Sequence, residues 1–173
     1  MLERWLRRSP QGPDNAEVRS LFCCMGNICR SPTAEGVVRA RLESAGLADR
    51  VELASAGTHA GHVGSRTDPR AQAAAAARGV DLSRIRARRV TEEDFLRYDR
   101  IYAMDRDNLR NLQRNCPEGV QHKLALFLQH AESFDEDEVP DPYYGGPAGF
   151  ERVLDLIEDA ADGLLRDLVQ QLK

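Results

Sequence analysis

The chain has 173 residues, of which 30% are charged, and its formal net charge is −4 at pH 7. This length is sufficient for one domain with a full hydrophobic core. The acidic balance argues against nucleic acid as a partner, and no apolar run approaches the ~20 residues that cross a bilayer. Four cysteines fit a reducing cytoplasm better than a disulfide framework.

The first residues differ in composition from the rest of the chain. They are polar and include Pro10, Gly12 and Pro13, which is typical of a segment with little structure of its own. Three arginines without an apolar core of about 7–15 residues argue against a secretory signal. We therefore predict a flexible extension over 1–16 and a single domain over 17–173.

A strand, a loop and a helix start are predicted for residues 21–32, LFCCMGNICRSP. The apolar run over 18–23 is typical of a buried strand, and the Ser-Pro pair suits a first helical turn. A loop in this position directs successive backbone amides inward, and the helix dipole adds to their attraction for an anion. Gly26 and Asn27 adopt left-handed φ values most readily, and Arg30 offers a planar fork for two phosphate oxygens.

Cys24 lies at the mouth of this predicted anion cradle. The positive field that binds an anion also favours the thiolate over the thiol. We therefore predict that Cys24 is a nucleophile held against a bound phosphoryl group. The alternative is an inert buried cysteine in a tight strand-to-helix turn, and the convergence of Gly26, Asn27, Arg30 and a helix start favours the nucleophile.

The remaining elements follow from apolar spacing and from the positions of glycine and proline. Apolar residues at the helical period predict an amphipathic helix over 32–45, ended by Gly46, with an apolar face formed by Ala34, Val37, Val38, Leu42 and Ala45. The elements predicted beyond it are a strand over 51–56, an alanine-rich helix over 69–78 ended by Gly79, a helix capped by Thr91, a strand over 100–104, a helix over 106–114 capped by Asp105, a strand over 123–127, an acidic loop over 132–146 and a helix over 148–172.

Strands that alternate with helices imply right-handed crossovers and a parallel sheet. Four strands covered on both faces give the α/β class, as a three-layer α/β/α sandwich. Ligands of such sheets bind beyond the carboxyl ends of the strands. Because Cys24, Asp105 and the acidic loop each follow a predicted strand, we expect them to meet at one edge of the sheet.

The spacing around Cys24 resembles the signature of the low-molecular-weight protein tyrosine phosphatases. The matching positions are Cys24, Gly26, Asn27, Cys29, Arg30 and Ser31, and the resemblance continues to residue 173. It implies a four-stranded parallel sheet of order 2-1-3-4 with helices on both faces. It also implies hydrolysis of phosphotyrosine-type aryl phosphates, free or on a protein, through a phosphocysteine and without a cofactor. The residues expected to contact substrate in the loop are Met25, Gly26, Asn27, Ile28, Cys29 and Ser31.

The predicted general acid is Asp141, in the segment VPDPYYGG. In-line phosphoryl transfer needs a nucleophile on one side of phosphorus and a proton for the leaving oxygen on the other. Pro140 and Pro142 limit the backbone around Asp141, and the acidic residues over 132–138 are expected to help it keep its proton. From the residues alone, Asp141 is equally well explained as a turn residue in a solvated loop. The resemblance of DPYY to the family's acid loop favours the acid.

Three further residues are expected to support the loop. The Ser31 hydroxyl either donates a hydrogen bond to the Cys24 sulfur or caps the helix, and both are compatible. The resemblance assigns to Asn27 the role of fixing the loop through its side chain. Asp105 is either a plain helix cap or, as the resemblance implies, a carboxylate behind the phosphate loop, and one oxygen can serve each purpose.

Other residues near the predicted site have two interpretations each. The resemblance implies that Cys29 protects Cys24 from irreversible oxidation by forming a disulfide with it, whereas the alternative is a small packing residue. Tyr143 and Tyr144 are expected to flank the cleft mouth and contact substrate, unless they are ordinary exposed tyrosines. The spacing of the four histidines matches no zinc pattern, so no metal is expected.

The sequence departs from the family pattern at Gly61. The family usually has an aromatic residue there, which walls the pocket, and its loss removes about 0.5–1.5 kcal/mol of ring-specific contact. A wider and less selective mouth is the expected result, with His59 or His62 as a partial replacement.

Two alternative functions compete with the phosphatase. An arsenate reductase on the same scaffold needs further cysteines to relay a disulfide, and only Cys116 lies beyond Cys29. A non-catalytic phosphate-binding module needs no acid at Asp141. The presence of Cys24, Arg30 and Asp141 together favours the hydrolase.

Overall fold

A computed structural model describes residue 13, residues 15–143 and residues 145–173. Most of the extension predicted over 1–16 lies outside the described residues, as does Tyr144, so the extension's flexibility stays a prediction. The elements follow in the order β1 (Val18–Cys24), α1 (Arg30–Ser44), β2 (Val51–Gly57), α2 (Pro69–Ala76), α3 (Glu92–Arg97), β3 (Arg100–Ala103), α4 (Arg106–Asn115), β4 (Leu124–Leu126) and α5 (Pro147–Gln171), with short 3-10 helices at Ala48–Arg50, Glu118–Lys123 and Phe127–His130.

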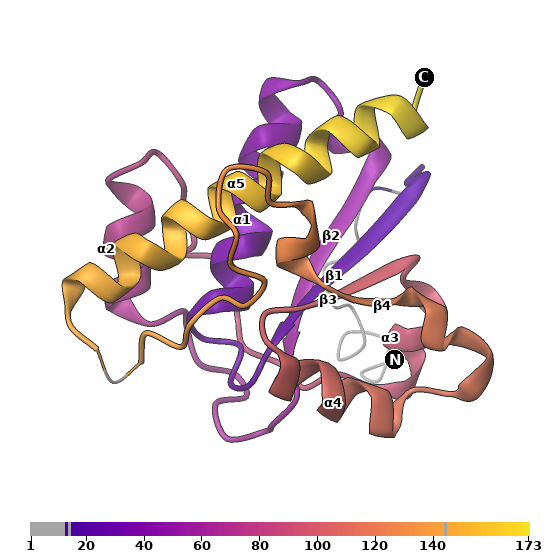
Figure 1. The fold of residues 1–173 in the computed structure, drawn as a ribbon, viewed down its shortest axis with the longest axis horizontal. Helices are drawn as coiled ribbons and strands as arrows, with labels where there is room; N and C mark the ends of the chain where they lie inside the picture. The colour runs from indigo at the N-terminus through magenta and orange to yellow at the C-terminus, as the bar shows by residue number, and fades with distance from the viewer. Residues whose placement is uncertain (1–12, 14, 144) are drawn as a thin grey trace, which may run out of the picture.

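The four strands form one parallel sheet in the order β2-β1-β3-β4, as expected (Figure 1). The central strand β1 ends at Cys24, which is in register with Gly57 of β2, and Cys23 is in register with Ala103 of β3. The loops that follow these three strands therefore begin at the same edge of the sheet. The predicted gathering of the site at the carboxyl ends of the strands is confirmed.

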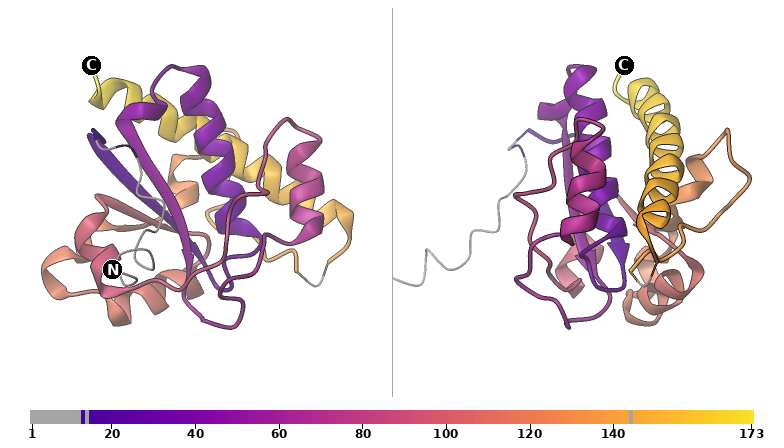
Figure 2. Two further views of the ribbon diagram at one scale, coloured as in Figure 1. Left: turned by 180° about the vertical axis from the view of Figure 1, so that it is seen from behind. Right: turned by 90° about the vertical axis from the view of Figure 1, so that its left-hand side faces the viewer.

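Successive residues of β1 face opposite sides of the sheet. Phe22 and Cys24 belong to the larger core, shared with α1 and α5, whereas Leu21 and Cys23 belong to a second core with α3 and α4. Figure 2 shows these helices on the two sides of the strands. The three-layer sandwich is therefore confirmed, and Cys23 is a core residue as predicted.

The helix α1 differs from the prediction in position and in character. It begins at Arg30, and all nine residues from 30 to 38 are buried. An amphipathic pattern was expected, but α1 contacts β1, β2, α2 and α5, so its first half has no face open to solvent. Ala45, expected on the apolar face, is exposed because it lies past the end of that enclosed part.

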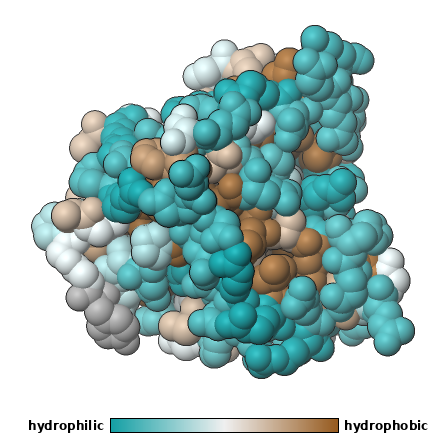
Figure 3. Space-filling view, viewed as in Figure 1, coloured by the Kyte–Doolittle hydropathy of each residue, from teal (hydrophilic) through white to brown (hydrophobic). Residues whose placement is uncertain are grey.

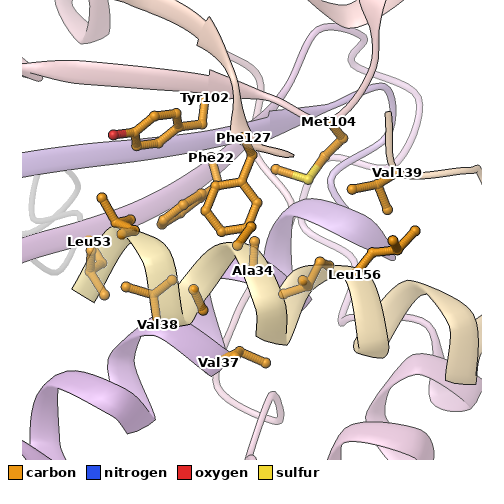
Figure 4. Close-up of a cluster of buried hydrophobic side chains, with 14 of the residues drawn as sticks. Phe22, Ala34, Val37, Val38, Leu53, Tyr102, Met104, Phe127, Val139 and Leu156 are labelled. Carbon is orange, nitrogen blue, oxygen red and sulfur yellow. The ribbon is translucent and has the colours of Figure 1, made fainter. Parts of the chain in front are cut away.

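Aromatic packing holds β1 in the larger core. The Phe22 ring lies 5.8 Å from the Tyr102 ring and 5.2 Å from the Phe127 ring, measured between centroids. Figure 4 shows these rings together, with Met104 and Val139 beside them. Such aromatic contacts add about 0.5–1.5 kcal/mol each beyond the burial of area. They anchor the strand two residues before Cys24.

On the face drawn in Figure 3, the surface is mostly hydrophilic. The apolar residues visible on this face lie mainly in the region between α5 and α4. No helix within the described residues has the length and apolar character needed to cross a membrane.

Several helix and strand boundaries differ from the predicted ones by one or two residues. The strand β4 is shorter than predicted because Lys123 and Phe127 belong to 3-10 helices on either side of it.

Candidate active site

The loop between β1 and α1 turns its carbonyl groups away from its centre. The carbonyl oxygens of Met25, Ile28 and Cys29 accept hydrogen bonds from His59, Asp68 and Thr33, at 3.0, 2.8 and 3.3 Å. Among the described residues, none accepts a hydrogen bond from the backbone amides of residues 26–29. Buried amides normally find an acceptor. A ring of amides without a protein acceptor, ahead of a helix N-terminus, is an anion-binding nest.

The two residues expected to adopt left-handed backbone behave differently. Asn27 has a φ of +57° and Gly26 does not have a positive φ, so that prediction is wrong for Gly26. At Gly26 a Cβ would lie 2.9 Å from Cδ2 of His62, so a larger residue would push that side chain aside. Gly57 at the end of β2 is more constrained, since a Cβ would lie 2.8 Å from the Met25 carbonyl oxygen, a backbone atom.

A chain of hydrogen bonds leads to the sulfur of Cys24. The Arg88 amide donates to Oδ1 of Asn27 at 3.0 Å, and Nδ2 of Asn27 donates to Oγ of Ser31 at 2.8 Å. The Ser31 oxygen lies 2.9 Å from Sγ of Cys24. Since Asn27 already donates to the Ser31 oxygen, the Ser31 hydroxyl is free to donate its hydrogen to the sulfur. A hydrogen bond in that direction would stabilise a sulfur that attacks or leaves as an anion.

The other cysteines have surroundings that disfavour the thiolate. Burial, together with the charge of Asp68, raises the pKa of Cys29 to about 12. Complete burial also raises the pKa of Cys23 far above its usual range. All four cysteines are free thiols in this structure, so a disulfide between Cys24 and Cys29 stays a prediction. Among the three cysteines at the end of β1, Cys24 is the one suited to act as a nucleophile.

Arg30 is the cation of the loop and is 3% exposed. Its Nη1 donates to Oδ2 of Asp105 at 2.5 Å and to the Val139 carbonyl at 3.0 Å. The other oxygen of Asp105 accepts from the amide of Asn108 at 2.7 Å and so caps α4. Asp105 thus makes both of the contacts that the sequence left open. Burial alone would lower the pKa of Arg30, but the charges of Cys24, Asp105 and Asp141 outweigh it and raise that pKa.

Asp141 lies beside this guanidinium. Its Oδ2 is 3.7 Å from Nη2 of Arg30, and its Oδ1 accepts a hydrogen bond from the Tyr143 amide at 3.1 Å. The Asp141 side chain is 39% exposed, which contrasts with the buried loop opposite. The structure therefore brings together the sulfur, the guanidinium and the carboxylate that the sequence singled out.

Most of the acidic residues that were expected to help Asp141 keep its proton have cationic partners of their own, so that expectation stays a prediction. Four of those residues pair with arginines from helices, in the pairs Glu132–Arg166, Glu136–Arg152, Asp137–Arg106 and Glu138–Arg106. Asp141 itself lies 3.7 Å from Nη2 of Arg30, which carries a charge of the opposite sign.

A residue that sequence reasoning missed joins the two loops. Arg70 makes a bidentate contact with Asp68 and donates to the Tyr143 carbonyl at 3.0 Å. Its guanidinium carbon lies 4.9 Å from the centre of the Phe150 ring. The Asp68 amide in turn donates to Ile28 in the phosphate loop. The sequence signal was the Asp-Pro-Arg segment at the start of α2, where an Asp cap brings an arginine to a helix N-terminus.

The mouth of the site lacks an aromatic wall at Gly61, which is exposed and has no atom within 4 Å of a Cβ built there. Of the two histidines considered as replacements, His62 lies against Gly26 and 6.2 Å from the Tyr143 ring, between ring centres. His59 instead lies beside Thr58, with Nδ1 3.0 Å from the hydroxyl oxygen. The structure favours His62 as the wall, with Met25 and Tyr143 exposed nearby at 47% and 36%.

No group of three or more His, Cys, Asp or Glu residues suited to a metal ion occurs in the described part of the chain. The positive charge available to a phosphate comes from Arg30 and the loop amides.

Comparisons with known proteins agree on one family. A family model for low molecular weight phosphotyrosine protein phosphatase matches residues 19–173. A low molecular weight protein-tyrosine-phosphatase of Streptomyces coelicolor is 42% identical over 158 residues, which are 90% of this chain and 96% of that protein. The low molecular weight phosphotyrosine protein phosphatase of Homo sapiens is 37% identical over 136 residues, 77% of this chain and 84% of that protein. The crystal structure of an Entamoeba histolytica protein tyrosine phosphatase with Hepes in the active site matches with a TM-score of 0.86 and 38% identity, over 91% of this chain and 100% of that chain.

Proposed function

The chain belongs to the low molecular weight phosphotyrosine protein phosphatase family, and we propose that it hydrolyses aryl phosphate monoesters through a phosphocysteine on Cys24. One observation carries the proposal. Within the described residues, the backbone amides of residues 26–29 have no protein acceptor, and they lie between Cys24 and Arg30, whose guanidinium also meets Asp141. This arrangement is suited to a tetrahedral dianion seated over a sulfur nucleophile.

In the first step, the Cys24 thiolate attacks phosphorus and the bond from phosphorus to the phenolic oxygen breaks. Arg30 and the loop amides hold the equatorial oxygens, where charge is spread in the transition state. Asp141 transfers its proton to the departing phenolate, which leaves as a phenol. Asp105 keeps the guanidinium of Arg30 oriented through the contact at 2.5 Å.

In the second step, water attacks phosphorus and the bond from phosphorus to sulfur breaks. Asp141, now ionised, accepts a proton from that water. The products are inorganic phosphate and the Cys24 thiolate, which Ser31 stabilises through the contact at 2.9 Å. No redox partner is needed, since the sulfur returns to its starting state.

The competing functions have less support. A reductase that relays a disulfide needs further thiols that can react with Cys24 in turn, but Cys23 and Cys116 pack in the second core, on the side of the sheet that carries α3 and α4. A phosphate-binding module would not need a carboxylate beside the guanidinium of Arg30.

The test is turnover of an aryl phosphate by the full chain in buffer without added thiol. We expect phosphate release together with a phosphoryl group trapped on Cys24 after rapid acid quench and mass spectrometry. The outcome that would reject the proposal is consumption of thiol that depends on arsenate, with no release of phosphate from the aryl ester.

The breadth of the substrate pocket is part of the proposal. The open space at Gly61 supports a wider mouth than one walled by an aromatic ring. Because the lost ring contact is worth only about 0.5–1.5 kcal/mol, we expect KM for alkyl phosphates to lie within about tenfold of KM for the aryl series. A KM for phosphotyrosine far below that for alkyl esters would contradict the wider pocket. We also propose that the enzyme works in the cytoplasm on phosphotyrosine proteins, since Cys24 must stay reduced to react.

A further inference from the structure

An excess of positive charge borders the active site in a chain that is acidic as a whole. Residues 64–89 contain seven arginines and two aspartates, which gives this segment a net charge of +5 against −4 for the chain. Two of the seven, Arg70 and Arg88, form ion pairs with Asp68 and Asp94 and contact the loops of the site. The mechanism uses none of the exposed arginines Arg66, Arg86 and Arg89.

These three arginines lie on two backbone segments that pair with each other, residues 64–66 and residues 86–89. We call this pair of segments the arginine ribbon. The amide of Gly64 donates to the carbonyl of Ala87, and the amide of Ala87 donates to the carbonyl of Ser65, both at 2.8 Å. Arg66 and Arg86 are partners in an antiparallel bridge, so their side chains emerge side by side.

The bridge between Arg66 and Arg86 places two positive charges opposite each other. Like charges directly opposite each other across an antiparallel pair are destabilising. Within the part of the chain that the structure describes, neither arginine has a carboxylate within 4.0 Å, and Arg89 has none either. The acidic loop provides the contrast, since its charges are paired with Arg106, Arg152 and Arg166. A bound anion would relieve the repulsion on the ribbon.

The ribbon is joined directly to the phosphate loop. The Arg88 amide donates to Asn27 at 3.0 Å, and Arg89 forms a parallel bridge with Gly57, which is packed against the loop at Met25. Arg86 and Arg89 are therefore within two residues of a contact with the loop, a span of about 7 Å of extended chain. The acidic loop follows β4, at the opposite edge of the sheet from β2, and the right-hand view of Figure 2 shows it on the far side of the molecule.

We propose that the arginine ribbon binds acidic side chains that flank the phosphotyrosine of a protein substrate. This inference rests on the proposed phosphatase function and names the class of substrate. An extended peptide rises about 3.3 Å per residue, so acidic residues within about four positions of the phosphotyrosine reach the ribbon. Arginine suits this task because its planar fork matches a carboxylate.

The experiment compares two phosphotyrosine peptides, one with four Glu residues next to the phosphotyrosine and one with Gln in their place. We expect the full chain to hydrolyse the acidic peptide with kcat/KM about five- to tenfold higher at low salt, mostly through KM. The preference should disappear in high salt, since exposed charges are screened.

The variant is the triple substitution Arg66→Gln, Arg86→Gln and Arg89→Gln. It should lose the preference for the acidic peptide and keep wild-type turnover of the Gln peptide and of a small aryl phosphate. The matched control is Arg100→Gln with Arg114→Gln, two exposed arginines without a carboxylate partner among the described residues. The control should keep the preference.

Two readouts separate this role from others. If the ribbon were only structural, the triple variant would melt at a lower temperature, whereas removal of like charges should leave Tm unchanged or raise it. Duplex DNA and anionic vesicles of equal total charge are added as competitors. Stronger competition by either than by an unphosphorylated acidic peptide would overturn the proposal, as would a triple variant that retains the preference.

Failure of the proposed function gives a different result. If no aryl phosphate is hydrolysed, the phosphatase proposal fails, and peptide binding by the Cys24→Ser variant still tests the ribbon. If small aryl phosphates are hydrolysed and both peptides react equally, the phosphatase stands and the ribbon proposal is overturned.

Discussion

The phosphate loop, between β1 and α1, and the acidic loop that carries Asp141 contribute to one proposed reaction. The two loops are held in different ways. The phosphate loop is buried: Asn27 and Ser31 are 1% and 0% exposed, and a line of hydrogen bonds runs from Arg88 to the sulfur of Cys24. The acid loop is open to solvent, with Asp141 39% exposed. Its contacts with the rest of the site include the Asp141 carboxylate and the Val139 carbonyl on Arg30 and the Tyr143 carbonyl on Arg70.

This difference fits the two tasks. A nucleophile and its anion seat gain from being rigid and prearranged, because donors that are already oriented need no reorganisation during the reaction. A general acid must reach the leaving group and then admit water, which suits a half-exposed position. Four variants test this difference between the two loops, and they are given in order of decreasing expected effect.

The largest effect is expected for Cys24→Ser. A hydroxyl at this position remains protonated and is a poor nucleophile, so turnover should fall by about 10⁴-fold or more. Phosphate binding should persist, since the loop amides and Arg30 are unchanged, and calorimetry with inorganic phosphate measures it. Substantial residual hydrolysis by this variant would exclude a covalent role for Cys24.

Asp141→Ala should reduce kcat by about 10²–10⁴-fold for substrates with poor leaving groups. The loss should shrink as the phenol becomes more acidic, because a good leaving group needs no proton. A series of substituted aryl phosphates gives the slope of log kcat against phenol acidity. Asp135→Ala, an exposed acid earlier in the same loop, is the control and should keep the wild-type slope. Equal losses for all leaving groups would argue against general acid catalysis.

Arg70→Ala tests whether the acid loop depends on its anchor. Loss of the contacts with Tyr143 and Phe150 should let Asp141 shift, and a displacement of about 1 Å can cost up to about 100-fold in rate. We expect about 10- to 100-fold lower kcat for poor leaving groups and a steeper slope in the same aryl series. Arg152→Ala is matched, since Arg152 also stacks on an aromatic ring, at 4.7 Å from Phe134. An unchanged slope with lower stability would mean that Arg70 only supports the fold.

Ser31→Ala should have the smallest effect of the four. It removes the hydroxyl 2.9 Å from Sγ of Cys24, and a hydrogen bond to a charged group is worth about 1.5–3 kcal/mol. We expect alkylation of Cys24 by iodoacetate at neutral pH to slow by about tenfold. Thr33→Val removes a neighbouring hydroxyl that donates to the Cys29 carbonyl instead of the sulfur. Equal slowing in both variants would indicate a general disturbance of the loop.

The difference between the two loops also explains which features of the site could be predicted from the sequence. Cys24, Asn27, Arg30 and Ser31 occupy eight consecutive residues, so their contacts depend on local geometry that residue types and spacing encode. The sheet order followed from the alternation of strands and helices and from the family resemblance. The left-handed backbone of Asn27 also followed from residue type, whereas the same prediction failed for Gly26, which instead lies against the His62 side chain.

The sequence by itself predicted the parallel sheet and led us to propose the nucleophile and the anion cradle, because each depends on neighbours along the chain or on a regular period. Tertiary structure alone decided what joins segments far apart: the pairing of the acidic loop with helix arginines, the Arg70 anchor and the opposition of Arg66 to Arg86. The physical reason is that the sequence gives the sign of each charge but not the residue with which that charge pairs. The strength of an ion pair depends on distance and burial, which the fold sets.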